Sequence, residues 1–452
     1  MNISANQTKH QPQSVAVLGA GESGEAAADL LAASGCTVTV LDSAPEERLR
    51  AKIDKLAERG IRVIAGPAAE QDEAIYDRVI LSPGIDPATA LVQHFTKRGY
   101  ELTGELELAY ESCKCPVVAI TGTNGKTTTT QLVETMLNAC HLRTLAAGNI
   151  GPAFSARVSQ SKDLDIMTLE VSSFQLETIR AFHPHIAVWL NFAADHLDRY
   201  ASMEEYYAAK IRIFENQTDG DWAIVKLGDK LPPLNARVLT FSGYEQGGDF
   251  DLRDGVIHFR GKPVLPMAET NLRGVHNAEN LMAALAVGFA LGLPFERMCP
   301  PLADYRALPH RCELIRTLDG VDYVNDTKAT NLDAMEKALD SETRPVVLIA
   351  GGKDKGFEFD SITDLVAAKC RVVILIGEMA PRIAASWQDR VPCFQAGFLL
   401  GEAVRLAQQH ARPGDVVLLS PGTSSFDMFK NYAERGNQFR ALVQALSETH
   451  QP

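Results

Sequence analysis

Short apolar runs rich in β-branched residues recur along the chain, and each is followed by a turn and a longer stretch with helical spacing. Apolar runs of about 4 to 8 residues between turns are typical of buried strands, and longer stretches with a period of about 3.6 residues are typical of helices. Because strand and helix alternate, the pattern predicts α/β units with parallel sheets. The predicted strands are residues 15–18, 37–41, 62–65, 78–81, 117–120, 165–169, 186–190, 321–324, 346–350, 372–376 and 416–419.

The strand predicted at residues 117–120 leads into a glycine loop, and a helix is predicted over residues 127–140. The loop has the sequence Thr-Gly-Thr-Asn-Gly-Lys-Thr from position 121. Gly122 and Gly125 allow backbone N–H groups to turn toward an anion at the helix N-terminus, where the helix dipole also favours negative charge. The segment therefore predicts a phosphate-binding loop.

Two side chains of this loop indicate which phosphates it binds. Lys126 would reach the β- and γ-phosphates of a nucleoside triphosphate, and the Thr127 hydroxyl would bind Mg²⁺. The general motif has a glycine where this chain has Ile120. We therefore expect a nucleoside triphosphate site that differs from an ordinary P-loop.

A second glycine loop, Gly-Ala-Gly-Glu-Ser-Gly at residues 19–24, follows the first predicted strand. The next strand ends at Asp42, eighteen residues after Gly24. This is the dinucleotide fingerprint, with an acidic residue placed for a ribose hydroxyl. Taken alone it favours NAD, but it leaves the identity of the nucleotide open. The Ser-Pro-Gly-Ile loop at residues 82–85 ends a neighbouring strand of the same unit, where such sheets bind ligands.

Polar residues follow the predicted strands of the central segment. Glu170 is placed at a strand end where a carboxylate can hold Mg²⁺, although a glutamate stabilised by a helix dipole would look the same. His196 lies between Asp195 and Asp198 directly after the next strand. These side chains are expected at the same sheet edge as the phosphate loop.

Two predicted helices add further polar side chains. Lys210, on the helix predicted over 203–215, has the pattern of an ordinary helix lysine. Asn277 and Asn280 begin a long apolar helix and are three residues apart, so they share a face and could both address a purine or ribose. Simple N-capping by Asn277 is the alternative interpretation.

The last third of the chain has three polar loops after predicted strands, at residues 325–331, 351–356 and 420–427. The carboxyl ends of parallel strands share one sheet edge, so these loops should gather there and face the phosphate loop. Arg311 precedes the first strand of this segment. The stretch between Pro294 and Pro309 is predicted to be a linker.

Composition narrows the class of protein. The net charge of -13 argues against general nucleic-acid binding or attachment to an anionic membrane. No apolar run approaches the length of about 18 residues needed to span a membrane, and the polar N-terminus lacks the apolar core of a secretory signal. The eight cysteines show no paired CxxC spacing, so we expect free thiols in a cytoplasmic protein.

At 452 residues the chain is long enough for about two to four domains. The three groups of strands predict an α/β protein of three domains. We expect a disordered tail (1–14), a Rossmann-like N-terminal domain (15–104), a central P-loop-type mononucleotide-binding domain (105–307) and a C-terminal Rossmann-like domain (308–452).

Five motifs in series resemble the Mur ligases, the ATP-dependent amide-forming enzymes of peptidoglycan precursor synthesis, which are related to folylpolyglutamate synthase. The motifs are residues 122–127, 195–199, 276–280, 309–311 and 325–331. The first glycine fingerprint and the Ser-Phe-Asp-Met-Phe-Lys-Asn-Tyr stretch from position 425 resemble the D-glutamate-adding branch. No Asp-Asn-Pro-Arg signature of the diaminopimelate- or lysine-adding branch is present.

The resemblance implies transfer of D-glutamate to UDP-N-acetylmuramoyl-L-alanine through an acyl phosphate, with ATP and two Mg²⁺ ions. The first domain would then hold UDP rather than NAD. Two positions depart from the family: Ala44 replaces a basic residue that some members have near the uracil, and Tyr432 replaces the usual Phe. Carbamylation of Lys210 is also implied, which would turn it into an anionic Mg²⁺ ligand.

The resemblance further implies the role of each site residue. ATP contacts are implied at Gly122, Thr123, Asn124, Gly125, Lys126, Thr127, Thr128, Asn277, Asn280, Arg311 and Asp326. UDP-substrate contacts are implied at Ser23, Asp42, Gly84, Asn149 and His196. D-glutamate contacts are implied at Thr330, Lys355, Ser425, Phe426 and Tyr432. The catalytic residues would be Lys126, His196, Lys210 and Lys328, and the metal ligands Thr127, Glu170, His196 and carbamylated Lys210.

Three alternatives stay open at this point. An NAD-dependent oxidoreductase explains residues 19–42 but gives no role to the Lys126 loop. Another Mur-type or folylpolyglutamate-type amide ligase would share most of the motifs. A non-catalytic nucleotide-binding module would not need Lys126, Glu170, His196 and Arg311 together. We expect a monomer that binds neither nucleic acid nor membrane.

Overall fold

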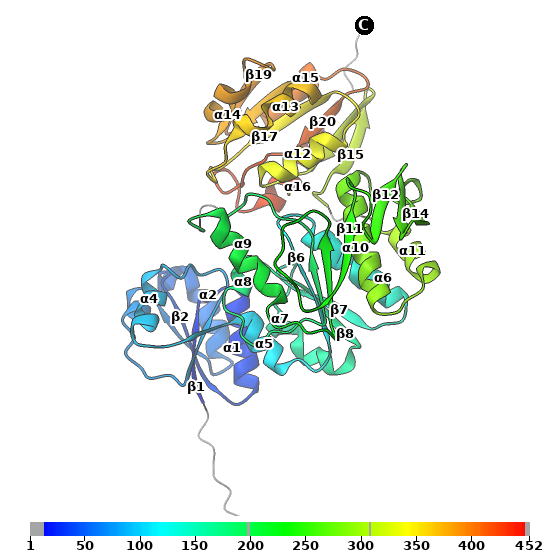
Figure 1. The fold of residues 1–452 in the computed structure, drawn as a ribbon. Coiled ribbons are helices and arrows are strands. Elements are labelled where there is room, and N and C mark those ends of the chain that lie inside the picture. Colours follow the sequence, from blue (N-terminus) through cyan, green and yellow to red (C-terminus); the bar gives the residue numbers. More distant parts are fainter. Residues whose placement is uncertain (1–12, 197–198, 307–308, 448–452) are drawn as a thin grey trace, which may run out of the picture.

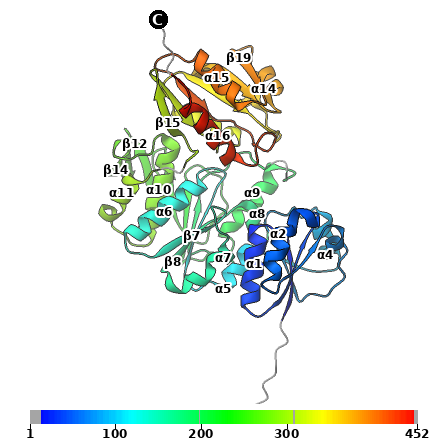
Figure 2. The same ribbon diagram turned by 180° about the vertical axis from the view of Figure 1, so that it is seen from behind.

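The computed structural model describes residues 13–196, 199–306 and 309–447. Three lobes follow one another in chain order, and each is built on its own sheet (Figures 1 and 2). The predicted α/β class is therefore confirmed. Residues 1–12 of the predicted tail lie outside the described residues, whereas Gln13 and Ser14 already belong to the first sheet or its edge, since the Gln13 carbonyl accepts a hydrogen bond from Thr37 N.

The first lobe has a five-stranded parallel sheet in the order β3-β2-β1-β4-β5. Its middle strand, β1, is buried along most of its length, as expected for a strand covered on both faces. The strands are β1 (Ser14–Leu18), β2 (Thr37–Asp42), β3 (Arg62–Ala65), β4 (Arg78–Leu81) and β5 (Leu102–Gly104). The helices are α1 (Glu22–Ala33), α2 (Glu46–Ala57), α3 (Pro67–Glu70) and α4 (Ala90–Lys97).

The central lobe has a nine-stranded sheet in the order β14-β13-β12-β11-β10-β9-β6-β8-β7, of which β13 and β14 alone add antiparallel pairs among the described residues. Its strands are β6 (Val117–Thr121), β7 (Thr144–Gly148), β8 (Ile166–Glu170), β9 (Ile186–Trp189), β10 (Trp222–Lys226), β11 (Arg237–Ser242), β12 (Phe250–Arg253), β13 (Val256–Phe259) and β14 (Lys262–Pro266). Its helices are α5 (Glu105–Ser112), α6 (Lys126–Ala139), α7 (Phe154–Arg157), α8 (Ser173–Leu176), α9 (Met203–Ile211), α10 (Val275–Ala290) and α11 (Phe295–Asp304).

The C-terminal lobe has a six-stranded sheet in the order β15-β16-β20-β17-β18-β19, in which β15 is antiparallel to β16. Its strands are β15 (Glu313–Leu318), β16 (Val321–Asn325), β17 (Val346–Gly351), β18 (Cys370–Ile376), β19 (Cys393–Gly397) and β20 (Val416–Leu419). Its helices are α12 (Leu332–Ser341), α13 (Thr363–Lys369), α14 (Ala380–Trp387), α15 (Leu400–His410) and α16 (Tyr432–Gln444).

Every predicted strand is found, with ends that differ by at most two residues. The linker predicted between Pro294 and Pro309 is wrong for most of its length, because α11 forms there and packs against α6. Two prolines at 300 and 301 concealed this helix, whose buried side chains include Met298 and Leu302. The helix predicted over 203–215 ends as α9 at Ile211 and continues as a 3₁₀ turn.

The lobes meet along different elements. Helices α1, α5 and α7 pack together and join the first lobe to the central lobe. The C-terminal lobe lies over the end of the central lobe where the phosphate loop opens α6, and α12 faces that end (Figure 1). Among the described residues, no helix is both long and apolar enough to cross a membrane.

Candidate active site

The loop between β6 and α6 has two positions, Gly122 and Gly125, that only glycine can occupy without strain. Gly125 has a φ of 83°, and a methyl group there would overlap Oδ1 of Asn280. A methyl group at Gly122 would lie 2.9 Å from Cβ of Leu190. Both glycines therefore allow the loop to lie close to its neighbours.

Asn191, two residues after the end of β9, holds this loop in shape. Its Oδ1 accepts a hydrogen bond of 2.9 Å from Asn124 N, and its Nδ2 donates to the Asn124 carbonyl at 3.1 Å. Its own carbonyl accepts from Thr123 N at 3.0 Å. The loop is therefore fixed before a ligand binds, which lowers the entropy cost of binding.

Two lysines converge on the carbonyl of Gly122. Lys126 Nζ donates to that oxygen and to the Thr123 carbonyl, each at 2.8 Å. Lys210 Nζ, from α9, donates to the same Gly122 oxygen at 2.8 Å, and its side chain is among the largest fully buried ones. Burial and then the charge of Lys126 hold the pKa of Lys210 well below its usual range.

Glu170 ends β8 beside this loop and is 2% exposed. Its Oε1 accepts a hydrogen bond of 2.8 Å from Asn149 Nδ2, while its Oε2 is buried with no hydrogen-bond partner among the described residues. An unpartnered buried carboxylate oxygen is costly, so it indicates a cation or donor that binds there. The residues present thus fit a Mg²⁺ ion at this position.

His196 has a φ of 57°, and its ring packs edge-to-face with Phe174, with 4.8 Å between ring centroids. Burial lowers the pKa of His196 to about 4, even though Asp195 opposes the shift. The imidazole is therefore neutral at pH 7 and can ligate a metal. Asp198 of the same motif lies outside the described residues.

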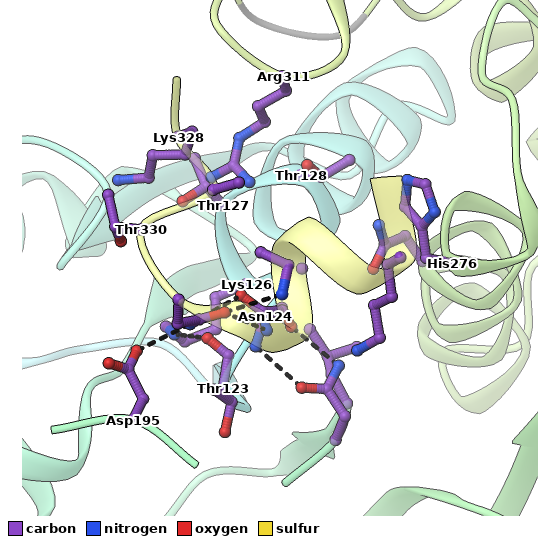
Figure 3. A pocket seen from close by; sticks show the side chains of 18 of the residues that line it. Thr123, Asn124, Lys126, Thr127, Thr128, Asp195, His276, Arg311, Lys328 and Thr330 are labelled. Atoms are coloured by element: carbon purple, nitrogen blue, oxygen red, sulfur yellow. Dashed lines mark hydrogen bonds between the residues drawn. The ribbon is translucent and has the colours of Figure 1, made fainter. Parts of the chain in front are cut away.

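A cavity of about 280 Å³ opens above the phosphate loop and is lined from both the central and the C-terminal lobes. Figure 3 shows Arg311, Lys328 and Thr330 on the C-terminal side of the cavity, opposite Thr123, Asn124 and Lys126. Asn277 and Asn280 line it from α10 and are joined by a hydrogen bond of 3.2 Å. N-capping by Asn277 is wrong, since the N-cap of α10 is Gly274.

The C-terminal lobe contributes an acid and a base with shifted pKa values. Burial raises the pKa of Asp326 to about 7, although Ser420 Oγ donates to its carboxylate at 2.9 Å. Burial and then Arg311 lower the pKa of Lys328 to about 8, and Lys328 Nζ lies 3.9 Å from the centre of the Tyr432 ring.

Asp195 joins the central lobe to the C-terminal lobe. Its carboxylate accepts hydrogen bonds from Lys355 Nζ at 3.1 Å and from Asn331 Nδ2 at 3.0 Å. Burial alone would raise the pKa of Asp195, but Lys355, His196 and the hydrogen bonds outweigh it and hold that pKa at about 2. A second contact runs from Asn124 Nδ2 in the phosphate loop to the carboxylate of Asp333 on α12.

Comparison with known proteins identifies the family. Three family models match in succession: the MurD-like N-terminal domain of Mur ligases at residues 13–104, the Mur ligase middle domain at 120–288, and the glutamate ligase domain of Mur ligases at 310–423. The chain belongs to the Mur ligase family. The predicted resemblance is thereby confirmed.

Relatives of this Mur ligase match it over nearly its whole length. A UDP-N-acetylmuramoylalanine–D-glutamate ligase of Geobacter metallireducens is 40% identical over 97% of this chain and 99% of the relative. The enzyme of the same name from Koribacter versatilis is 41% identical over 96% and 98%. The structure of a UDP-N-acetylmuramate–alanine ligase from Thermotoga maritima matches with a TM-score of 0.62 and 18% identity, covering 96% and 99% of the two chains, which supports the fold.

The cavity of this Mur ligase brings together most, but not all, of the site residues predicted from sequence. Predicted residues that line it are Thr123, Asn124, Gly125, Lys126, Thr127, Thr128, Asn149, Glu170, His196, Asn277, Asn280, Arg311, Asp326, Lys328, Thr330 and Lys355. Predicted residues outside its lining are Gly122, Lys210, Ser425, Phe426, Tyr432 and the first-lobe residues Ser23, Asp42 and Gly84.

The predicted residues outside the lining have different positions. Lys210 Nζ donates a hydrogen bond to the carbonyl of Gly122, at the start of the phosphate loop. Ser425 is buried, whereas Phe426 is 67% exposed. In the first lobe, the Asp42 carboxylate accepts hydrogen bonds from Ala20 N at 2.7 Å and Ala44 N at 2.8 Å. Asp42 therefore shapes the first glycine loop.

Sequence reasoning missed several side chains of the Mur ligase cavity. Asn191 lies two residues after the end of β9, so the rule that ligand-binding residues follow strand ends could have found it. Asn331 caps α12 while its amide bonds Asp195, and capping conceals that second contact. Lys337 lies further along α12 and lines the cavity, with no local signal to distinguish it from a surface lysine.

Proposed function

We propose that this Mur ligase joins D-glutamate to UDP-N-acetylmuramoyl-L-alanine and converts ATP to ADP and phosphate. The full-length relatives at about 40% identity bear the name of that reaction. Their names and the MurD-like first domain favour D-glutamate over the amino acids of other amide ligases. The structural observation that carries the proposal is one cavity that combines a phosphate loop, the unpartnered Glu170 oxygen and lysines from the opposite lobe.

The chemistry proceeds in two steps. An oxygen of the alanyl carboxylate attacks the γ-phosphorus of ATP, which breaks the bond to ADP and leaves an acyl phosphate. The D-glutamate amine then attacks the acyl carbon, and the tetrahedral intermediate expels phosphate as the amine loses a proton. Both steps bring anions together, so catalysis consists mainly of positioning and charge neutralisation.

The chain's cations surround the place where the phosphates would bind. Lys126 is half-buried, and it would exchange its bonds to the Gly122 and Thr123 carbonyls for bonds to the β- and γ-phosphates. Arg311 and Lys328 would approach the phosphates from the other lobe. Asn277 and Asn280 would address the adenosine, and Asp326 a ribose hydroxyl. The N–H groups of residues 125–128 would donate to the phosphates, whereas those of Thr123 and Asn124 already donate to Asn191.

Two Mg²⁺ ions would neutralise the repulsion between the carboxylate and the γ-phosphate. Thr127 would hold one ion beside the phosphates. Glu170 and His196 would hold the other nearer the acyl centre, and the unpartnered Glu170 oxygen and the neutral imidazole support this assignment. Within the described parts of the chain, no group of three or more His, Cys, Asp and Glu side chains is placed to hold a metal ion, so substrate oxygens and water would complete each coordination shell.

Carbamylation of Lys210 is part of the proposal. The reaction forms a bond between Nζ and the carbon of CO₂ and releases a proton, so it requires a neutral amine. Burial and the adjacent Lys126 favour that neutral form. Protein equilibrated with ¹³C-bicarbonate should give a carbamate ¹³C resonance that is absent from Lys210→Met. A spectrum without this resonance in the wild type would remove the carbamate from the proposal.

The remaining substrates would bind around the same cavity. Ser23, Asp42, Gly84 and Asn149 would contact the UDP-muramoyl substrate, together with His196. Thr330, Lys355, Ser425, Phe426 and Tyr432 would receive D-glutamate, whose two carboxylates require a cation and hydroxyl groups. We place the domain limits at 15–104, 105–307 and 308–452, and we propose a cytoplasmic monomer, which light scattering would test.

The decisive assay is phosphate release from ATP in the presence of UDP-N-acetylmuramoyl-L-alanine. Release should depend on D-glutamate and should not respond to L-glutamate, D-alanine or diaminopimelate. A folate acceptor with L-glutamate serves as the control for the folylpolyglutamate-type alternative. Stimulation by another amino acid, or by the folate acceptor, would overturn the proposed substrates.

A further inference from the structure

Two loops form the ligand edge of the first sheet. They are residues 19–24 after β1 and residues 82–85 after β4. A methyl group at Gly19 would lie 2.9 Å from Cγ1 of Ile85 and 3.1 Å from Cβ of Ser82, so the two loops touch. They therefore present one continuous surface at the carboxyl ends of parallel strands, where such sheets bind nucleotides.

The charges of this surface are poorly suited to an anion. Neither loop contains Lys or Arg. Glu22 lies exposed in the first turn of α1, and Asp42 lies at the end of β2. These carboxylates offset the favourable dipole of α1 and would repel a diphosphate. A diphosphate bound here needs a cation from elsewhere in the lobe.

Lys52 brings such a cation to the first loop. It lies on α2, thirty-two positions from Ala20, and its Nζ donates a hydrogen bond of 2.6 Å to the Ala20 carbonyl. The side chain is half-buried, and no carboxylate forms an ion pair with it among the described residues. Lys55 on the same helix differs, because it pairs with Glu25.

An ammonium group has three N–H donors, and the Ala20 carbonyl uses one of them. Two donors and the full charge therefore remain at the glycine loop. A lysine of this kind recognises phosphate as a point charge and does not select the base of the nucleotide.

We infer that Lys52 binds the diphosphate of the UDP-bearing substrate. The inference rests on the proposed function, which assigns a nucleoside diphosphate to the first lobe, and it adds a binding residue from α2. Lys52 selects for the charged diphosphate over the uncharged nucleoside.

Binding of UDP and of uridine to the full chain tests the inference by titration calorimetry. Lys52→Met should weaken UDP binding by about 10-fold or more and leave uridine binding unchanged, since uridine lacks the charge that Lys52 contacts. Lys52→Arg should retain most of the UDP affinity. Lys97→Met on α4 is the matched control, and an unchanged circular-dichroism spectrum and unfolding midpoint show that each variant is folded.

Two other outcomes would overturn the inference on Lys52, and a third would contradict the proposed function. Equal UDP affinity in Lys52→Met and the wild type would overturn the inference. An equal loss of UDP and uridine affinity would also overturn it, because Lys52 would then only support the loop. A wild type that binds neither ligand would instead contradict the assignment of UDP to the first lobe, and with it the proposed function.

Discussion

The two glycine loops of the molecule follow the same local plan and differ in charge. Each follows a buried parallel strand and opens a helix, α1 in the first lobe and α6 in the central lobe. Helix α6 begins with Lys126 and has no acid in its first turn, whereas α1 has Glu22 and Glu25 there. By our proposal, the same backbone plan thus serves a triphosphate in the central lobe and a UDP group in the first lobe.

The surroundings of the two loops differ as well. The central loop lies under the C-terminal lobe, with Lys210 buried below it, so its charges act in a medium of low polarity. In the first loop, Gly21 and Glu22 are exposed. In the proposed function, bond formation needs the covered environment, while the first loop only has to hold a substrate whose reacting end lies elsewhere.

The largest expected effect separates the loops by function. Lys126→Ala should lower kcat/KM for D-glutamate-dependent phosphate release by at least about 100-fold, because it removes the cation that we assign to the transferred phosphate. UDP binding to the first lobe should not change. Lys114→Ala, an exposed lysine of the same lobe, is the control. Near-normal turnover in Lys126→Ala would contradict the assignment of the central loop.

Gly24→Ala should disturb the first loop and leave the central loop unchanged. A methyl group at Gly24 would overlap the carbonyl oxygen of Gly19. The strain should raise KM for the UDP substrate by about 10-fold and lower the free energy of unfolding by about 1–3 kcal/mol. KM for ATP should stay the same. Gly21→Ala has open space around the added methyl group, so its free energy of unfolding should stay near that of the wild type. Equal stability of the two variants would show that the loop can relax.

Local sequence patterns were sufficient to predict both loops, because a strand, a glycine turn and a helix start lie within a few residues of each other. These patterns could not predict the contact of Lys52 with the first loop, because its hydrogen bond to Ala20 depends on how α2 packs beside that loop. The contacts of Asp195 with Lys355 and of Asn124 with Asp333 join residues more than 150 positions apart. Helix α11 was missed for a different reason, since its adjacent prolines are typical of a break.

Asp326, which lines the cavity above the central loop, tests how burial changes the pKa of a carboxyl group. Its pKa is about 7 in the folded protein, above the value near 3.8 expected when unfolded. Between these values the unfolded chain releases a proton that the folded protein keeps, so this group costs stability as pH rises from about 4 to 7. Asp326→Asn should therefore gain about 1–3 kcal/mol in unfolding free energy at pH 8 relative to wild type, with little gain at pH 4.

Urea unfolding at both pH values measures this difference. The same substitution should raise KM for ATP about 3- to 10-fold, since the ribose would lose a charged acceptor. Asp340→Asn, an exposed acid on α12, is the control. A stability change that is the same at both pH values would show that folding does not raise the pKa of Asp326.

The smallest expected effect concerns how another lobe holds the central loop through hydrogen bonds. Among the described residues, no hydrogen bond joins residues 19–24 of the first loop to another lobe. Asp333 on α12 accepts hydrogen bonds from Asn124 of the loop and, at 2.7 Å, from Lys337. Asp333→Asn should keep the shape but remove the charge, so KM for ATP should rise only about 2- to 3-fold. Asn191 still fixes the loop backbone, which explains the modest size. Steady-state kinetics provides the measurement, and a loss as large as that of Lys126→Ala would mean that lobe contact, more than the loop itself, organises the phosphate site.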